Sequence, residues 1–340
     1  MPRHTDTAAL LNATAGHVAT LLGGKAAIEP GRTVRGLCPD AVLAVTQGRN
    51  TRRFPVEARA GLTRAGLGPA IEQVRRHGGT GLLATRFVNP QLAQELRQAD
   101  TQFADCAGNA FLRGAGLLIF TTGNRPREPL PRAPARPLRP AGAQVVFALL
   151  CNPGLERAPY REIAAKAGVA LGTIAGVVGD LVAAGYVEHG RGHVRRLVRK
   201  ENLLDRWVTA YVEQLRPKLL LERYRAAADD WWKDAHPGDG LWGGEVAAWL
   251  KTGFLRPQAA TLYGERIAPE AIIKHRLTRD PAGNVELLRR FWGFEYTDPK
   301  GPLVHPILAY ADLLADPGKR TREAAEILRE QHIAGYLRQD

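Results

Sequence analysis

The chain has 340 residues, of which 45% are hydrophobic and 24% charged, a composition typical of a folded globular protein. Its length predicts two or three domains and excludes a single small one. The net charge is +13 at pH 7, and residues 1–200 hold 27 Lys and Arg against 13 Asp and Glu, whereas residues 201–340 hold 20 against 21. A positive excess confined to one part of the chain favours a polyanionic partner for that part.

No uninterrupted apolar stretch is long enough to cross a bilayer, and the first residues lack the basic and apolar pattern of a signal peptide. We therefore expect a soluble cytoplasmic protein without a membrane partner. The three cysteines, Cys38, Cys106 and Cys151, stand far apart and form no CxxC pair. This spacing predicts reduced thiols and no structural zinc site, and we expect no cofactor.

Residues 1–123 alternate between helical and extended patterns. Residues 6–22 predict a helix with one apolar side, formed by Leu10, Leu11, Val18, Leu21 and Leu22. Strands are predicted at 40–46, 53–59 and 80–86, helices at 64–77 and 89–98, and two or three further strands within 102–121. The order helix, three strands, helix and strand predicts an α/β domain.

Residues 124–142 contain six prolines and five arginines, a composition that predicts a linker. Proline neither continues a helix nor donates to a strand ladder, so this segment is expected to be extended and semi-rigid. Its arginines could contact DNA phosphates, or the segment could be a solvated tether.

Residues 143–200 predict a winged helix-turn-helix. Helices are expected at 143–151, 159–167 and 171–184, with Gly168 and Gly185 ending the second and third. Two short strands follow around the glycine-flanked tip Gly190-Arg191-Gly192. Small residues where the helices meet, together with a basic hairpin, are typical of a module that binds duplex DNA. A protein-binding winged helix would show a similar pattern.

The candidate DNA-binding residues lie at the helix starts and on the wing. They are Tyr160, Arg161, Thr173, Arg191, His193, Arg195, Arg196 and Arg199. The expected recognition helix holds three glycines and no Arg, Lys, Asn or Gln, the side chains that make bidentate contacts with base edges. We therefore expect affinity to come from phosphate contacts, the wing and DNA shape.

Residues 201–340 contain all six tryptophans, which indicates a large aromatic core. Helices are expected at 203–227 and 319–337, giving a mostly helical α+β domain. Gly243-Gly244-Glu245 predicts a tight turn into a helix, as in nucleotidyltransferase-like folds, and is weak evidence for phosphate binding. No paired carboxylates have a convincing polymerase spacing, so this near-neutral domain is expected to bind a protein partner or to form a homodimer.

The predicted order of elements before the linker resembles the core of PD-(D/E)xK restriction endonucleases. Pro39-Asp40 and Glu57-Ala58-Arg59 match the motif except that Arg59 replaces its lysine. The resemblance implies that Asp40 and Glu57 would bind Mg²⁺ in an active enzyme, with Arg59 as the third catalytic candidate. Arginine cannot give up its proton near neutral pH, so we expect no catalysis. In the non-catalytic interpretation Asp40 caps a strand and Glu57 pairs with a neighbouring arginine.

A second resemblance extends from about residue 35 to residue 330. Residues 104–111 (ADCAGNAF) are similar to the iDxaGNAy stretch of AbiEi-type antitoxins, the regulators of type IV toxin–antitoxin and abortive-infection loci. The pattern continues at 160–164 (YREIA), 171–173 (LGT), 241–248 (LWGGEVAA) and 310–314 (YADLL). The resemblance implies an autorepressing DNA-binding antitoxin whose locus also encodes a nucleotidyltransferase-like toxin.

Three functions fit these patterns. The first is a winged-helix repressor of the antitoxin type, whose partners are double-stranded DNA and a toxin. The second is a Mg²⁺-dependent DNA nuclease guided by the winged helix. The third is a non-catalytic protein-interaction module.

Overall fold

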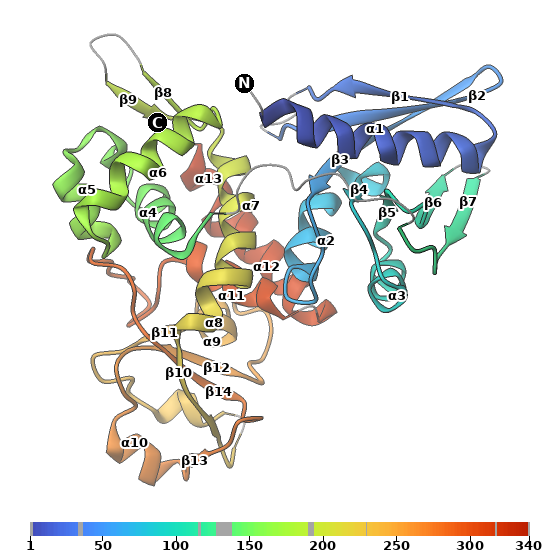
Figure 1. Cartoon of the computed structure of the whole chain (residues 1–340). Helices are drawn as coiled ribbons and strands as arrows, with labels where there is room; N and C mark the ends of the chain where they lie inside the picture. The colour runs from blue at the N-terminus through green and yellow to red at the C-terminus, as the bar shows by residue number, and fades with distance from the viewer. Residues whose placement is uncertain are drawn as a thin grey trace. The chain divides into compact units, whose positions relative to one another are not determined.

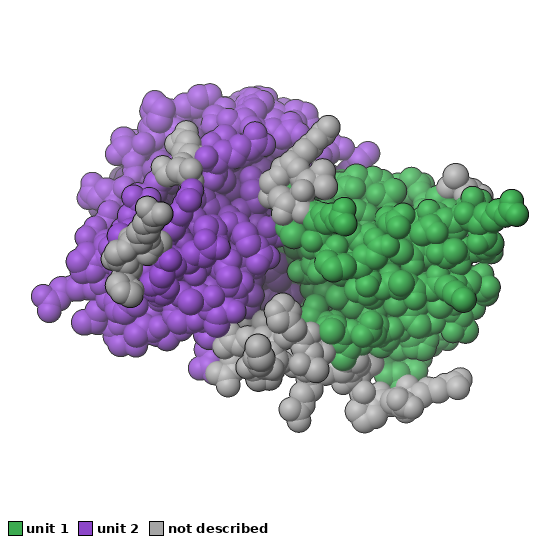
Figure 2. Space-filling model, turned by 90° about the horizontal axis from the view of Figure 1, so that it is seen from above, with its two compact units in different colours: residues 1–137 green, residues 138–340 purple. Residues whose placement is uncertain are grey.

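A computed structural model describes residues 3–32, 37–114, 117–126, 138–189, 194–228, 230–316 and 318–338. The chain divides into two compact units, residues 1–137 and 138–340, which Figure 2 shows in different colours. The division falls within the predicted linker, whose residues 127–137 lie outside the described ones. The structure as a whole is mixed α/β, with helices and several sheets.

The first unit is built on a seven-stranded sheet (Figure 1). In chain order its elements are α1 (Arg3–Leu22), β1 (Lys25–Pro30), β2 (Ala41–Gln47), β3 (Asn50–Arg59), α2 (Leu67–Arg75), β4 (Leu82–Thr85), α3 (Pro90–Gln98), β5 (Gln102–Asp105), β6 (Ala110–Gly114) and β7 (Leu117–Thr121). The strands follow one another across the sheet in sequence order. The pairs β3–β4 and β4–β5 are parallel and the other pairs antiparallel. The order helix, three strands, helix and strand is present, although the first of the three strands, β1, lies outside the predicted strand intervals.

Helices cover both faces of this sheet. On one face α1 buries Leu10, Leu11, Val18 and Leu22 against β2 to β6, whereas Leu21, predicted on the same side, is 37% exposed. On the other face α2 and α3 form a second apolar cluster with β4, β5 and β6. Asn89 caps α3 by accepting a hydrogen bond from the Leu92 N–H, as the Asn-Pro start predicts.

The second unit begins with α4 (Pro140–Cys151), α5 (Tyr160–Ala167), α6 (Leu171–Ala183) and the antiparallel hairpin β8 (Val187–His189) and β9 (Arg195–Leu197). These bounds agree with the predicted helices and hairpin. Gly168 and Gly185 have φ of 67° and 71°, the left-handed conformation that lets glycine end a helix.

The rest of the unit is a five-stranded sheet with helices. Its elements are α7 (Lys200–Ala210), the π-helical turn Tyr211–Leu215, α8 (Arg216–Leu219), β10 (Leu220–Arg225), β11 (Leu241–Gly243), α9 (Gly244–Thr252), β12 (Ala260–Tyr263), α10 (Pro269–Lys274), β13 (Thr278–Arg279), β14 (Val285–Leu288), α11 (Pro306–Ala315), α12 (Lys319–His332) and α13 (Ala334–Leu337). The strand order is β11-β12-β14-β10-β13.

One predicted helix is only half correct. The interval 203–227 is helical as far as Leu219 and then continues as strand β10. β10 pairs with both β13 and β14, and these long-range pairings override the local helical preference of its residues. The predicted turn at Gly243-Gly244 into a helix is confirmed, with Gly244 at φ 51° as the first residue of α9.

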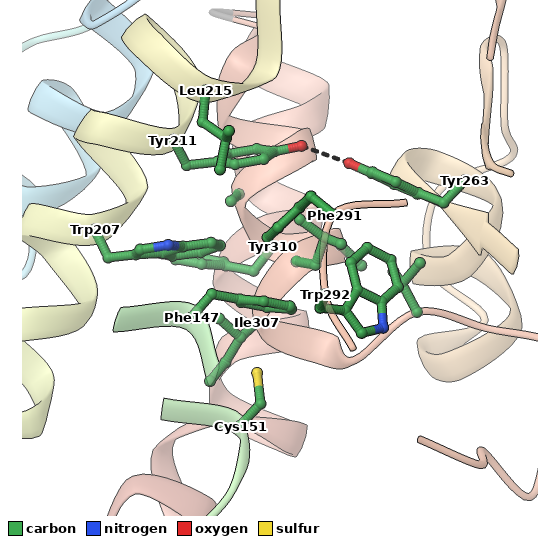
Figure 3. Close-up of a cluster of buried hydrophobic side chains, with 14 of the residues drawn as sticks. Phe147, Cys151, Trp207, Tyr211, Leu215, Tyr263, Phe291, Trp292, Ile307 and Tyr310 are labelled. Atoms are coloured by element: carbon green, nitrogen blue, oxygen red, sulfur yellow. Dashed lines mark hydrogen bonds between the residues drawn. The ribbon is translucent and has the colours of Figure 1, made fainter. Parts of the chain in front are cut away.

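The predicted segments 143–200 and 201–340 share one core. Phe147 on α4 stacks on Trp207 of α7 at 5.2 Å between ring centroids and also contacts Phe291 and Trp292 (Figure 3). Its ring contacts Phe294 as well. Five of the six tryptophans are buried and Trp249 is partly buried, so the predicted aromatic core is confirmed. Aromatic pairs contribute about 0.5–1.5 kcal/mol each beyond the area they bury.

Three further observations concern the described residues alone. No single helix among them is both long and apolar enough to cross a membrane, and only α5 and α6 taken together, with their sharp bend, reach that length and composition. They contain no group of three His, Cys, Asp or Glu residues placed to hold a metal ion. Cys151 is buried, whereas Cys38 and Cys106 are half-buried, and none of these three described residues forms a disulfide.

A buried histidine begins α11. The His305 side chain accepts a hydrogen bond from the Ile307 N–H at 3.2 Å and lies between the rings of Tyr296 and Tyr336. Burial, followed by the nearby Lys251 ammonium, lowers the pKa of His305 from 6.5 to about 3. The imidazole therefore stays neutral in the folded protein while an unfolded chain takes up the proton near pH 6.5.

The free energy of unfolding should consequently fall as the pH drops below about 6.5. One such histidine contributes about 1.4 kcal/mol per pH unit to that fall. His305→Asn keeps a capping acceptor and removes the titrating group, so its unfolding free energy should depend less steeply on pH. Urea unfolding followed by tryptophan fluorescence between pH 5 and 7 checks this. Equal slopes for the two proteins would contradict a neutral buried His305.

Candidate nucleic-acid interface

Helices α5 and α6 are held at a fixed angle by a glycine turn. Pro159 precedes α5. At the other end of this helix, the Gly168 N–H donates a hydrogen bond to the Ala165 carbonyl at 3.2 Å. The chain turns by 100° between α5 and α6. Helix pairs that place their second helix in a DNA groove cross at about 90–120°.

Helix α6 has one anchored side and one bare side. Ile174, Val178 and Leu181 are buried and fix the helix on the core. The exposed side carries mainly small residues, namely Leu171, Gly172, Ala175, Gly176, Gly179, Asp180 and Ala183. A Cβ atom added at Gly172, Gly176 or Gly179 would meet nothing within 4 Å, so packing within the chain does not require these glycines.

The predicted contact residues on these helices reach the surface to different extents. Tyr160, the first residue of α5, is 36% exposed, and Arg161 beside it is exposed. Thr173 in the first turn of α6 is half-buried. All three lie near the N-termini of their helices, where the helix dipole favours an anion.

The hairpin arginines differ in their surroundings. Arg195 is half-buried, donates from Nη2 to the Ala158 carbonyl at 2.6 Å and lies over the Tyr160 ring at 4.6 Å. These contacts brace the hairpin against the start of α5. Arg196 and Arg199 are exposed, and Arg199 also lies over the Tyr186 ring at 5.2 Å. The other two predicted wing residues, Arg191 and His193, lie outside the described residues.

In the first unit, the residues that resemble a nuclease motif meet where β2 begins beside the last residues of β3. Ala41 pairs with Val56, and continuing this register places Asp40 opposite Glu57. An Asp40 carboxylate oxygen accepts a hydrogen bond from the Ala58 N–H at 2.8 Å, a cap between neighbouring strands. Asp40 therefore fits its non-catalytic interpretation.

Glu57 is 4% exposed and is held by side chains from α2 and the turn that follows. Gln73 donates to one carboxylate oxygen at 2.5 Å, and His77 Nε2 lies 2.5 Å from the other. Arg59 donates to the same Gln73 side chain at 2.8 Å. Gln73 and His77 were not among the predicted site residues, and Arg59 joins the same cluster through its hydrogen bond to Gln73. No sequence spacing signals this contact between a strand and a later helix.

The stretch 104–111 organises a buried turn. Asp105 is fully buried and accepts hydrogen bonds from the backbone N–H groups of Val88, Ala107 and Asn109 and from the Asn109 side chain. The Asn109 amide in turn exchanges hydrogen bonds with the backbone of Asn124. Burial raises the pKa of the Asp105 carboxyl despite these donors. Asp105 therefore ties β4, β5 and the end of the sheet together.

The stretches 241–248 and 310–314 meet at Asp312. This fully buried carboxylate accepts hydrogen bonds from the hydroxyls of Tyr211 at 2.7 Å and Tyr263 at 2.9 Å and from Arg216 Nε at 3.0 Å. It also accepts the Gly244 N–H at 3.2 Å, at the start of α9. Burial raises the pKa of Asp312 and holds those of both tyrosines well above 10, so the hydroxyls remain donors.

This network changes the interpretation of the Gly-Gly turn. The backbone N–H that would face a phosphate at the start of α9 donates to the chain's own Asp312 carboxylate. The Arg216 guanidinium, which donates to Asp312, also donates from Nη2 to a Glu286 carboxylate oxygen at 2.6 Å. Both stretches belong to the predicted resemblance, whereas Tyr211, Tyr263 and Arg216 were not predicted at this site.

Comparison with known proteins bears on this second unit. Residues 196–334 match the family model described as "Transcriptional regulator, AbiEi antitoxin, Type IV TA system". The predicted resemblance to AbiEi-type antitoxins is thereby confirmed over the part of the chain that holds the Asp312 network and most of the aromatic core. No curated protein and no solved structure was found to match the chain.

The two neighbouring hairpin arginines should have separable effects on stability. Arg195→Ala removes a charged hydrogen bond and a cation–π contact, so the free energy of unfolding should fall by about 2 kcal/mol. Replacing the exposed Arg196 by Ala should lower the free energy of unfolding less, by at most about 1 kcal/mol, because solvent screens the interactions of an exposed arginine. Urea unfolding followed by tryptophan fluorescence measures both, since every tryptophan lies in the second unit. Equal losses would show that Arg195 is no brace.

Proposed function

We propose that the chain is a transcriptional repressor of the antitoxin type that binds double-stranded DNA through a winged helix-turn-helix formed by α4, α5, α6 and the β8–β9 hairpin. The arrangement of α5 and α6 carries this proposal, since they cross at 100° across a left-handed glycine with one side of α6 exposed. The family model, described as a transcriptional regulator, supports it independently.

The cations around these helices supply the affinity for DNA. Arg161 on α5 and Arg196 and Arg199 on and after β9 are exposed and suited to phosphate contacts. Arg195 contributes by positioning the hairpin. Phosphate contacts fix the position of a protein on the duplex without reading its sequence.

The bare side of α6 supports recognition through DNA shape. Its three glycines cost about 1 kcal/mol each relative to alanine in a helix interior, and no packing within the chain demands them. A surface without long side chains lets a helix backbone approach a groove wall closely. Because no donor or acceptor side chain other than Asp180 stands on this side, we propose that groove width and deformability supply the specificity.

For the first unit we propose a nuclease-like fold that has lost its chemistry and serves as a second basic DNA-binding surface. The order of α1 to β4 and the juxtaposition of Asp40 and Glu57 support the fold assignment. The hydrogen bonds from Gln73 and His77 to Glu57, and Arg59 in place of lysine, argue against Mg²⁺-dependent cleavage. A nucleotidyltransferase-like toxin, encoded beside this chain, completes the proposed system.

Binding to DNA should weaken steeply as salt rises. In a gel-shift titration with a duplex from the chain's own upstream region, Arg196→Ala should lower affinity and reduce the slope of log K against log salt by about 0.9, the value for one phosphate contact. Arg279→Ala removes an arginine that is 76% exposed on the five-stranded sheet and should leave the slope unchanged. Absence of any shift at low salt would instead favour a protein-interaction module.

Supercoiled plasmid incubated with the protein and Mg²⁺ or Mn²⁺ should remain supercoiled, because the motif offers no base to activate water. Agarose electrophoresis over several hours detects nicking. Asp40→Ala is the matched variant. Nicking by the unmodified protein that disappears in this variant would establish the nuclease alternative.

A further inference from the structure

The segment Arg289–Phe294 follows strand β14 and lies against the helices proposed to bind DNA. The Gly293 N–H donates to the Lys166 carbonyl in the last turn of α5 at 2.9 Å. Gln144 on α4 donates from Nε2 to the Phe291 carbonyl at 3.1 Å. One short segment of the C-terminal region is thus hydrogen-bonded to both helices that precede α6.

Two glycines allow this close approach. A Cβ atom added at Gly293 would lie 2.2 Å from the Ala165 carbonyl oxygen, closer than any side chain tolerates. A Cβ atom added at Gly168, the turn residue between α5 and α6, would lie 2.6 Å from the Phe291 carbonyl oxygen. The segment therefore touches the turn that sets the angle between the two helices.

The other side of the segment reaches the buried Asp312 network. The Trp292 ring contacts Tyr263 at 5.5 Å, and the Phe291 ring contacts Tyr211 at 6.4 Å. Figure 3 shows these two tyrosines joined through their hydroxyls, with Phe291 and Trp292 beneath them. The backbone of Arg289 is fixed as well, since its N–H donates to the Leu219 carbonyl at 2.8 Å.

We propose that the segment Arg289–Phe294 is a clamp through which the C-terminal region sets the position of the α5–α6 turn and thereby the affinity of the chain for DNA. The effect on affinity rests on the proposed function, whereas the hold on α5 and α6 does not. Because packed interiors shift between discrete arrangements and do not deform smoothly, a change around Tyr211, Tyr263 and Asp312 would reach the helices through Phe291 and Trp292. A protein partner bound to the C-terminal region would act on DNA binding by this route.

Gly293→Ala tests the clamp in the full-length chain. The added methyl group must push the segment away from Ala165 and break the hydrogen bond to Lys166. We expect affinity for the upstream duplex to fall by about tenfold, the effect of a small overpacking. Hydrogen–deuterium exchange measured by mass spectrometry should become faster in peptides that cover α5 and α6.

Two further variants accompany it. Gly335→Ala is the matched control, because a Cβ atom there meets nothing within 4 Å, and it should change neither affinity nor exchange. Gln144→Leu removes the hydrogen bond to Phe291 without a backbone clash and should weaken DNA binding about fivefold. It decides the outcome if Gly293→Ala fails to fold.

The two proposals fail in different ways. If the unmodified chain binds DNA and the clamp variants bind equally well with unchanged exchange, the clamp is wrong and the proposed function stands. If the unmodified chain binds no DNA, the proposed function is wrong. Hydrogen–deuterium exchange in the variants is then the test of the clamp. Faster exchange in α5 and α6 would then support the hold on these helices, and unchanged exchange would overturn it.

Discussion

The stacking of Phe147 on Trp207 joins the two halves of the second unit, and the rest of that unit depends on it. Phe147 belongs to α4 and Trp207 to α7, so this contact fixes the helices around the hairpin on the helices around the five-stranded sheet. The Phe147 ring also contacts the rings of Phe291, Trp292 and Phe294. Because one core serves both halves, α4 to α6 with their hairpin and the five-stranded sheet with its helices cannot move as independent domains within this unit.

Buried carboxylates organise both units. Asp105 accepts hydrogen bonds from backbone N–H groups at the end of the sheet. Asp312 accepts hydrogen bonds from a tyrosine hydroxyl, an arginine and the first N–H of α9, and a second tyrosine hydroxyl donates to it as well. A buried charge is expensive unless several donors surround it. Asn109 supplies donors to Asp105 from the same turn, whereas Gly244 supplies one to Asp312 from a distant part of the chain. Of the two carboxylates, Asp312 lies within the residues that match the antitoxin family model.

The elements that sequence reasoning placed correctly are those with local signals. Asn89-Pro90 begins α3, Gly168 and Gly185 end α5 and α6, and the apolar spacing of residues 6–22 predicts α1, because capping, chirality and helical periodicity act within a few residues. Strands β1 and β10 were not predicted, because each is defined by its pairing and not by the pattern of its own residues. β1 exists by pairing with β2, and β10 pairs with β13 and β14 across more than fifty residues.

The amino-acid sequence was sufficient for the charge distribution, the order of elements around α5 and α6, the lack of Arg, Lys, Asn and Gln on α6, and the similarity to AbiEi-type antitoxins over residues 196–334. The contacts of individual side chains were set by the tertiary structure. It turned Arg195 toward Ala158 and Tyr160, gave Glu57 its partners Gln73 and His77, and brought Asp312 to the Gly244 N–H. These contacts join residues far apart in the chain, and their strength depends on desolvation, which arises when the surrounding core closes.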